Sequence, residues 1–368
     1  MIYLDYGATT PIDKEVLDTY VRVSTNFFAN TSSLHKLGQE ANYMYELAVK
    51  EIKETLGLKN HNLVFTANAT EANNLAIFGI VNRHKSGKII TTKIEHPSVY
   101  NVMKYLESTY EVVYLNILEN GLIDLNQLEK EMTKDTILVS MMWVNNIIGT
   151  VQNINEAIKI VSKYRKAKLH VDAVQGLCKV TPDFDLNALD LFTFSSHKFY
   201  GPKGIGGLFF RNGIDLEKRL YGSSAQFSVK PGTFDLSLVC ATAKALKKFY
   251  PTTKLHQEHV KKLYMHLYEN IKAIDKFIIN TPVENISYYA LNISIPTIAG
   301  ETVVHHLEAD EIYVSTGSAC SSKLKKPEKT IYAMTNDEVR STTSIRLTFS
   351  HLTTMEEIDK VIESLRKL

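Results

Sequence analysis

The stretch FSSHKFYGPKGIGG, residues 194–207, places Lys198 between an apolar run and a segment with four glycines. Such a lysine could bind a nucleotide phosphate, could take part in chemistry itself, or could be a surface residue at a strand end. The P-loop pattern does not fit, because its lysine follows the glycines and opens a helix, whereas here an apolar strand comes next. The dinucleotide pattern GxGxxG does not fit either, because Phe209 stands where the third glycine should be.

The chain around this stretch alternates between strand-like and helix-like segments. Amphipathic segments such as 70–81 and 153–165 indicate helices. Short runs rich in β-branched and aromatic residues indicate seven strands, at 62–66, 88–92, 111–115, 136–144, 168–173, 189–195 and 206–211. This alternation predicts βαβ units, and therefore an α/β fold with a mostly parallel seven-stranded sheet.

The pattern changes near residue 252, which predicts a second domain. Helical segments with a polar face are expected at 254–274 and 354–367. They surround two further strand-like runs, at 288–295 and 344–350. We therefore expect a large domain over residues 14–252. Residues 1–13 and 253–368 are expected to form a smaller α+β domain.

Composition narrows the classes of partner and metal site. A formal net charge of +2 over 368 residues gives no reason to expect nucleic acid or an anionic membrane surface. The N-terminus lacks a signal pattern, and no stretch approaches the roughly 18 apolar residues of a membrane span, so we expect a cytoplasmic protein without a membrane partner. With only Cys178, Cys240 and Cys320 and no CxxC pair, neither a disulfide framework nor a metal site is expected. Cys178 and Cys240, in apolar strand and helix contexts, are interpreted as core residues.

Asp172 is the second candidate for chemistry, because it ends the apolar run 168–173. A buried carboxylate without a partner is unfavourable, so Asp172 should either cap a turn or face a cation such as a protonated pyridine. Lys198 follows Asp172 by 26 residues, a spacing that predicts the next strand but one. An aldehyde cofactor needs such a pair, since a lysine amine forms the imine and a carboxylate keeps the pyridine nitrogen protonated.

Groups that could hold a phosphate occur after two predicted strands, the one that precedes Thr70 and the one that leads to Lys198. A helix is expected to open near Thr70, where free N–H groups and the helix dipole favour an anion, although Thr70 and Asn73 could simply form an N-cap. Ser195 and His197 flank the lysine and supply a hydroxyl and an imidazole. His96 follows another strand end just before a helix, where it could be solvated or could stack on a planar cofactor.

Short motifs in a characteristic order extend over essentially the whole chain: YLDYGATTP (3–11), NATEANNLAI (68–77), EHPSV (95–99), VNNIIGTVQ (144–152), HVDAVQ (170–175), SSHKFYGPKGIGGL (195–208), PGT (231–233), STGSAC (315–320) and SIRLTFS (344–350). Together they resemble the cysteine desulfurases of the NifS/IscS type, within the pyridoxal-phosphate (PLP) enzymes of aminotransferase class V. The resemblance implies the PLP-dependent transferase fold type I. It also implies conversion of L-cysteine to L-alanine, with the sulfur left on Cys320 as a persulfide.

The resemblance further implies a role for each matching residue in cofactor chemistry. Lys198 would form the imine with PLP and move the Cα proton, Asp172 would pair with the pyridinium nitrogen, and Gln175 would bind the phenolic oxygen. His96 would stack on the ring and serve in proton transfer. The phosphate would be held by Ala69, Thr70, Ser195 and His197, with Ser196 beside them and Thr233 reaching in from the second subunit of a homodimer.

The same comparison assigns the substrate and sulfur positions. Asn146 and Arg346 would orient the substrate carboxylate, Arg346 through its planar fork. Cys320 would be the nucleophile, and a sulfur-acceptor protein, either an iron–sulfur scaffold or a tRNA thiolation enzyme, would be the partner. The chain departs from the family around Tyr221, Ser223 and Ser224, where histidine and glycines are common. The segment SSKLKKPEK after Cys320 is also more basic than usual.

Other functions remain open at this point. A class V aminotransferase or a cysteine or selenocysteine β-lyase would keep Lys198 and Asp172 but would need no thiol at position 320. A non-catalytic sulfur-assembly scaffold would be expected to lose the lysine or the aspartate. Because all three residues are present, the sequence favours the desulfurase.

Overall fold

The seven predicted strands form one sheet in the order β2-β8-β7-β6-β5-β3-β4. The computed structural model describes residues 1–317 and 327–368, so that Cys320 lies outside the described residues. Strand β8 runs antiparallel to both of its neighbours, while the other pairs are parallel. The strands are β2 (His61–Thr66), β3 (Lys88–Thr92), β4 (Glu111–Leu115), β5 (Thr136–Met142), β6 (Lys168–Asp172), β7 (Leu191–Ser195) and β8 (Gly206–Arg211). The predicted α/β class and the mostly parallel sheet are confirmed.

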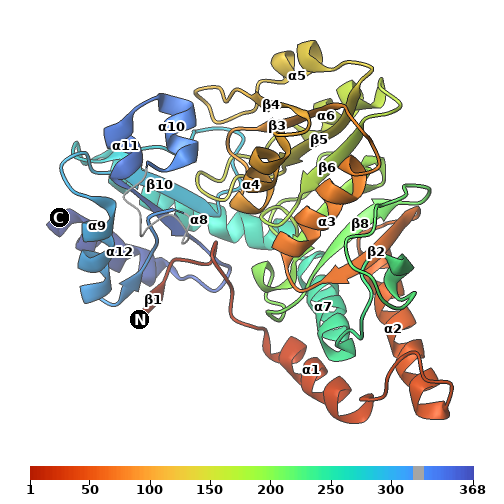
Figure 1. The fold of residues 1–368 in the computed structure, drawn as a ribbon. Helices are drawn as coiled ribbons and strands as arrows, with labels where there is room; N and C mark the ends of the chain where they lie inside the picture. The colour runs from red at the N-terminus through yellow and green to blue at the C-terminus, as the bar shows by residue number, and fades with distance from the viewer. Residues whose placement is uncertain (318–326) are drawn as a thin grey trace.

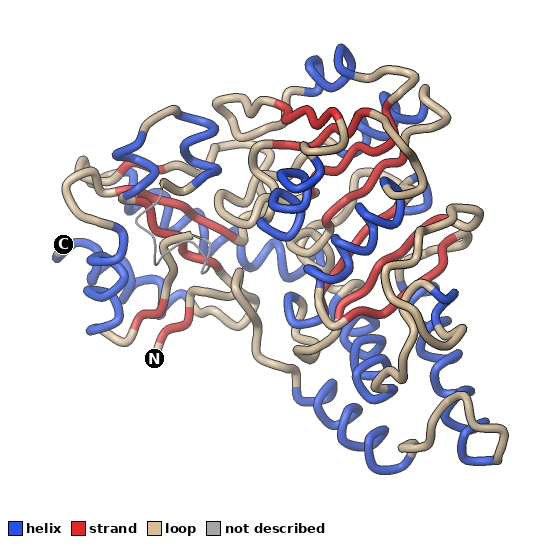
Figure 2. The backbone as a smooth tube through the Cα atoms, in the orientation of Figure 1, coloured by secondary structure: helices blue, strands red, loops and turns tan. Residues whose placement is uncertain are grey.

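Helices cover both faces of this sheet (Figures 1 and 2). Val64 and Ile89 pack in one hydrophobic core with α3 (Ala69–Val81) and α4 (Pro97–Leu106). Their neighbours Phe65 and Ile90 point to the opposite core, because successive side chains of a strand alternate between faces. The helices that contribute to this opposite core are α1 (Lys14–Asn26), α2 (Lys36–Thr55), α5 (Leu125–Glu131), α6 (Ile154–Ser162), α7 (Leu236–Phe249) and α10 (Lys329–Thr335).

A separate hydrophobic core lies in the part of the molecule that carries both termini (Figure 1). Its antiparallel sheet has the order β12-β10-β9, and a small parallel pair joins β1 to β11. The strands are β1 (Ile2–Tyr3), β9 (Ile278–Ile279), β10 (Ala290–Ser294), β11 (Ile312–Tyr313) and β12 (Ser344–Thr348). The helices that contribute to this core are α8 (Thr253–Lys272), α9 (Gly300–Ala309) and α12 (Met355–Lys367), and the short helix α11 (Glu338–Thr342) precedes β12. We propose that this core forms the smaller domain. The exact boundaries, after residues 13 and 252, stay a prediction.

The strands that carry Asp172 and Lys198 are closer in the sheet than the spacing predicted. Asp172 ends β6, and β6 pairs directly with β7, the strand that leads to Lys198. The two residues therefore follow neighbouring strands and not the next strand but one. The reason is that the segment between β6 and β7 contains turns and a short 3-10 helix, Leu186–Ala188, without a further strand of the sheet. Among the helices of the described residues, none is long and apolar enough to cross a membrane.

Two histidines, His256 in α8 and His351 after β12, stack beside Tyr200, which follows Lys198 by two residues. The rings of His256 and His351 lie 4.2 Å apart, centroid to centroid, and are nearly parallel. His351 also contacts Tyr200, whose hydroxyl lies 2.7 Å from the Ser350 hydroxyl. Burial lowers the pKa of His351 to about 4, with the nearby His256 acting in the same direction.

We expect this contact to weaken in acid. Because the folded pKa of His351 lies below the ordinary 6.5, the unfolded chain binds more protons between pH 6.5 and 4, and stability falls as the pH drops through that window. Replacing His351→Phe keeps the ring contacts and should reduce the loss by on the order of 2 kcal/mol. Urea unfolding at several pH values measures this, and an unchanged pH slope in the variant would contradict it.

Candidate functional site

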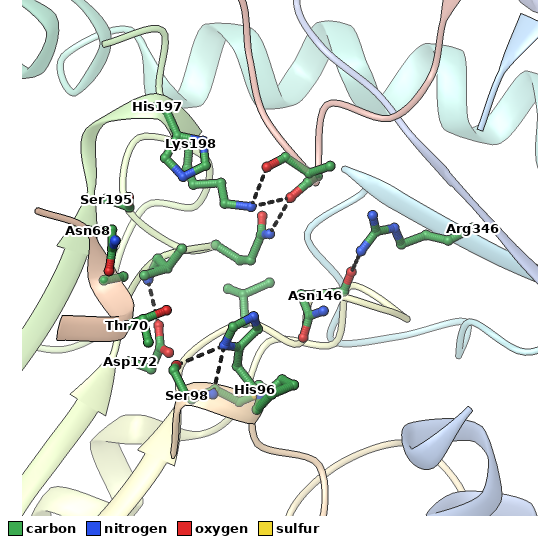
Figure 3. Close-up of a pocket in the computed structure, with 18 residues that line it drawn as sticks. Asn68, Thr70, His96, Ser98, Asn146, Asp172, Ser195, His197, Lys198 and Arg346 are labelled. Carbon is green, nitrogen blue, oxygen red and sulfur yellow. Dashed lines mark hydrogen bonds between the residues drawn. The ribbon is translucent and has the colours of Figure 1, made fainter. Parts of the chain in front are cut away.

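A cavity of about 270 Å³ lies where the parallel strands of the large sheet end, the usual ligand position in such sheets. Figure 3 shows Lys198, Asp172, His96 and Arg346 around it. The structure brings together most of the residues predicted for the site: Ala69, Thr70, His96, Asn146, Asp172, Gln175, Ser195, His197, Lys198 and Arg346. Two predicted residues do not line the cavity: Ser196 is buried with its hydroxyl 3.1 Å from that of Thr242, and Thr233 is exposed.

Lys198 is held at the cavity by the N-terminal segment. Its Nζ donates hydrogen bonds to the carbonyl oxygens of Gly7 and Ala8, at 2.6 and 2.8 Å. Burial lowers the pKa of Lys198 to about 8, and the positive charge of Arg346 acts in the same direction. A lysine whose pKa is this close to neutrality supplies the free amine that attacks a carbonyl carbon.

Asp172 is buried on the other side of the cavity, with 6% of its surface exposed. Its Oδ1 accepts a hydrogen bond from the Val174 N–H at 3.0 Å, and its Oδ2 accepts one from Asn73 Nδ2 at 2.9 Å. The idea that Thr70 and Asn73 form an N-cap was wrong. Helix α3 is capped by Asn68, whose side chain accepts from the Glu71 N–H, and Asn73 points into the protein.

The start of α3 and the end of β7 form a cradle for an anion. In the first helical turn the Glu71 N–H is used by the Asn68 cap, and the N–H groups of Ala69 and Thr70, which have no partners within the helix, are left for a ligand. Ser195 Oγ is buried beside them and has no hydrogen-bond partner among the described residues. The pKa of His197 is lowered to about 4 by burial and by Lys198, which leaves a neutral imidazole at the cavity. These donors suit a phosphate group, and they fit the cofactor that the sequence predicts.

Arg346 reaches the cavity from β12 and is 3% exposed. One Nη donates to Asp5 Oδ1 at 2.8 Å, and the other donates to the backbone oxygen of Asn146 at 2.9 Å. Both Nη atoms of the guanidinium that was predicted to bind a carboxylate are thus already hydrogen-bonded to the protein. Since each Nη carries two hydrogens, one hydrogen on each remains for an anion in the cavity.

Sequence comparisons agree with this geometry. The family model for aminotransferase class V matches residues 2–361. The chain belongs to the class V aminotransferase family. It is 37% identical to the cysteine desulfurase IscS of Neisseria meningitidis serogroup C over 371 residues, which span 99% of this chain and 91% of that protein. It is 38% identical to the cysteine desulfurase IscS of Aeromonas salmonicida over 373 residues, with 99% and 92% covered.

Solved structures support the same family assignment. A NifS-like protein superposes with a TM-score of 0.92 at 30% identity, covering all of both chains. The NifS-like protein from Rickettsia africae gives 0.89 at 28% identity, with 100% of this chain and 99% of that chain covered. The resemblance and the fold type inferred from the motifs are therefore confirmed.

In this member of the class V family, the two cysteines of the described residues are not suited to be nucleophiles. Cys178 and Cys240 are both buried, and burial raises the pKa of each thiol, that of Cys240 to about 11. Their prediction as core residues is confirmed, although Cys178 lies in a turn after β6 and not in a strand. Within residues 1–317 and 327–368, no group of three or more side chains is arranged to hold a metal ion.

Sequence reasoning missed Lys179, a buried lysine that orients Gln175. Lys179 Nζ donates to Gln175 Oε1 at 2.7 Å, which leaves Gln175 Nε2 to donate to the Gly7 oxygen at 2.9 Å. Burial lowers the pKa of Lys179 to about 7, helped by the charges of Lys198 and Arg346. Lysine is rarely buried, so nothing in its local sequence indicated this position.

Proposed function

We propose that this protein is a PLP-dependent cysteine desulfurase, which converts L-cysteine to L-alanine and leaves the sulfur on Cys320 as a persulfide. The observation that carries the proposal is the 37% identity to the cysteine desulfurase IscS across 99% of the chain. The cavity supports it, because a lysine, a buried carboxylate and an anion cradle surround one space. A sulfur-acceptor protein, either an iron–sulfur scaffold or a tRNA thiolation enzyme, would be the partner.

The residues present fit PLP. Ala69, Thr70, Ser195 and His197 would hold its phosphate, Asp172 its ring nitrogen and Gln175 its phenolic oxygen. When bound, PLP would supply an aldehyde for an amine and a ring that accepts electrons from the bonds at the substrate's Cα.

This chain's own residues would then position the substrate and move protons. Lys198 would hold PLP through its amine and, once released, take the proton from the substrate's Cα. Arg346 would bind the substrate carboxylate with the hydrogens that Asp5 and Asn146 leave free.

Cys320 would carry out the sulfur transfer. Its thiolate would attack the substrate sulfur, forming an S–S bond while the C–S bond breaks. The bonding electrons stay on the carbon skeleton, which takes up a proton and leaves as alanine. A thiol with an ordinary pKa of about 8.5 is only slightly ionised at neutral pH, so neighbouring positive charge would be needed to activate it.

Cofactor binding can be tested separately from turnover. We expect the purified protein to bind PLP and to retain it covalently after borohydride reduction, with the added mass on the peptide that contains Lys198. Lys203→Ala, on the same glycine-rich segment but outside the cavity lining, is the matched control for Lys198→Ala. Peptide mass spectrometry measures the adduct, and its appearance on another lysine would contradict the assignment.

Removing the thiol should separate sulfur transfer from cofactor binding. Cys320→Ser should bind PLP and cysteine as the wild type does, but it should lose at least about 100-fold in alanine and sulfide formation, because a hydroxyl is far harder to ionise than a thiol. Cys240→Ser is the control, since that thiol is buried. An aminotransferase or a β-lyase would keep its turnover in Cys320→Ser, and that result would exclude the desulfurase.

Thr233 gives a test of the predicted homodimer. It is exposed and absent from its own subunit's cavity, which is the position expected if it completes the neighbour's phosphate site. Mixed dimers of Lys198→Ala and Thr233→Ala subunits would then contain one intact site and regain PLP binding and turnover at limiting PLP. Dimers of wild type with the Lys198→Ala, Thr233→Ala double variant would contain none. Equal activity of the two mixtures would rule out sharing.

A further inference from the structure

Behind the cavity, a chain of buried hydrogen bonds connects Asp172 to His96 through two residues without an assigned role. Asn73 Nδ2 donates to Asp172 Oδ2 and to Ser98 Oγ, both at 2.9 Å. Ser98 Oγ in turn lies 2.8 Å from His96 Nδ1 (Figure 3). Asn73 is fully buried and Ser98 is 7% exposed, so water is not available to replace these partners.

The orientation of the Asn73 amide follows from its neighbours. An ionised carboxylate only accepts hydrogen bonds, so the NH₂ group must face Asp172. The amide oxygen then faces β7, where it accepts a hydrogen bond from Thr193 Oγ1 at 2.5 Å. Both hydrogens of Nδ2 are therefore used, one on Asp172 and one on Ser98.

The direction of the Ser98 hydroxyl follows from the contacts of His96 Nδ1. Because Ser98 Oγ accepts from Asn73, its single hydrogen is free to point at His96 Nδ1. The backbone N–H of Ser98 also donates to Nδ1, at 3.2 Å, since His96 caps helix α4. An imidazole nitrogen that accepts from two donors cannot carry a hydrogen of its own. In neutral His96 the hydrogen must then lie on Nε2.

We propose that Asn73 and Ser98 are positioning residues that hold His96 as a neutral imidazole with its hydrogen on Nε2, so that it donates a hydrogen bond into the cavity. This inference rests on the proposed function, because it concerns the histidine that would lie against the cofactor. It narrows the role of His96. With its lone pair on Nδ1 occupied by Ser98, His96 donates to negative charge in the cavity, and the substrate's Cα proton is left to Lys198.

The surrounding charges act on His96 in both directions. Burial lowers the pKa of His96, and the positive charges of Lys198 and Lys329 lower it further, while Asp172 raises it. Protonating Nδ1 would also break the hydrogen bond from the Ser98 N–H and would force the Ser98 hydroxyl to turn its hydrogen away. The hydrogen-bond chain therefore opposes the attraction of Asp172 for an imidazolium.

The tautomer can be read directly by nitrogen NMR of the purified protein labelled with ¹⁵N-histidine, with His96 identified through His96→Gln. In the wild type we expect hydrogen on Nε2 and an unprotonated Nδ1. In Ser98→Ala the hydroxyl donor to the neutral ring is lost, and in Asn73→Ala that hydroxyl is free to turn and accept from a protonated ring. The titration midpoint of His96 should therefore rise by about half a pH unit or more in both variants. Asn82→Ala is the matched control, since Asn82 is exposed at the C-terminal end of the same helix.

A wild-type His96 with its hydrogen on Nδ1 would overturn the proposal. So would folded Ser98→Ala and Asn73→Ala variants whose His96 midpoint and tautomer match the wild type, because a purely structural role would lower only the melting temperature. If Asn73→Ala does not fold, Ser98→Ala alone decides between the two outcomes. The spectra need no cysteine turnover, so a failed desulfurase assay leaves this test readable.

Discussion

The candidate site depends on the close approach of strand β8 to the start of helix α3, which a glycine at position 206 allows. Gly206 pairs with Thr66 on one side and with Ser195 on the other. A Cβ at this position would lie 2.7 Å from the carbonyl carbon of Asn68 and 2.9 Å from the nitrogen of Ala69, closer than real contacts. Because β8 is antiparallel, its first residue meets the last residues of both neighbouring strands. That geometry joins the two halves of the anion cradle.

The surroundings of the cavity carry more positive than negative charge. Lys198, Lys179 and Arg346 lie close enough for their charges to lower the pKa values of the two lysines. Asp172 and Asp5 are the carboxylates that act on Lys198, and Asp5 is already paired with Arg346. Buried cations in excess favour an anionic ligand, because its charge restores the balance that burial disturbs. A phosphate and an amino-acid carboxylate both meet this requirement.

Much of the fold could be predicted because the strands are short apolar runs whose burial is local and regular. The strands at 88–92, 111–115 and 206–211 coincide with their predicted bounds. Helices α1 and α2 were not predicted, because they pack mainly against α7, which is remote in sequence. The residues around the cavity could be predicted from the motifs, but their partners could not. Asn73 faces Asp172 only because α3 is capped at Asn68, a difference of two positions that no composition rule determines.

The N-terminal segment connects the two hydrophobic cores at Lys198. Gly7 and Ala8 accept hydrogen bonds from Lys198, although they lie about 190 residues away in sequence. The Gly7 N–H donates to Thr348 Oγ1 in β12, the strand that also carries Arg346. The two carbonyl oxygens favour the charged form of the Lys198 amine, whereas burial and Arg346 favour the neutral form. The lysine can leave these carbonyls only as it loses charge or gains another partner, so the N-terminal segment sets how readily the amine becomes available for bond formation.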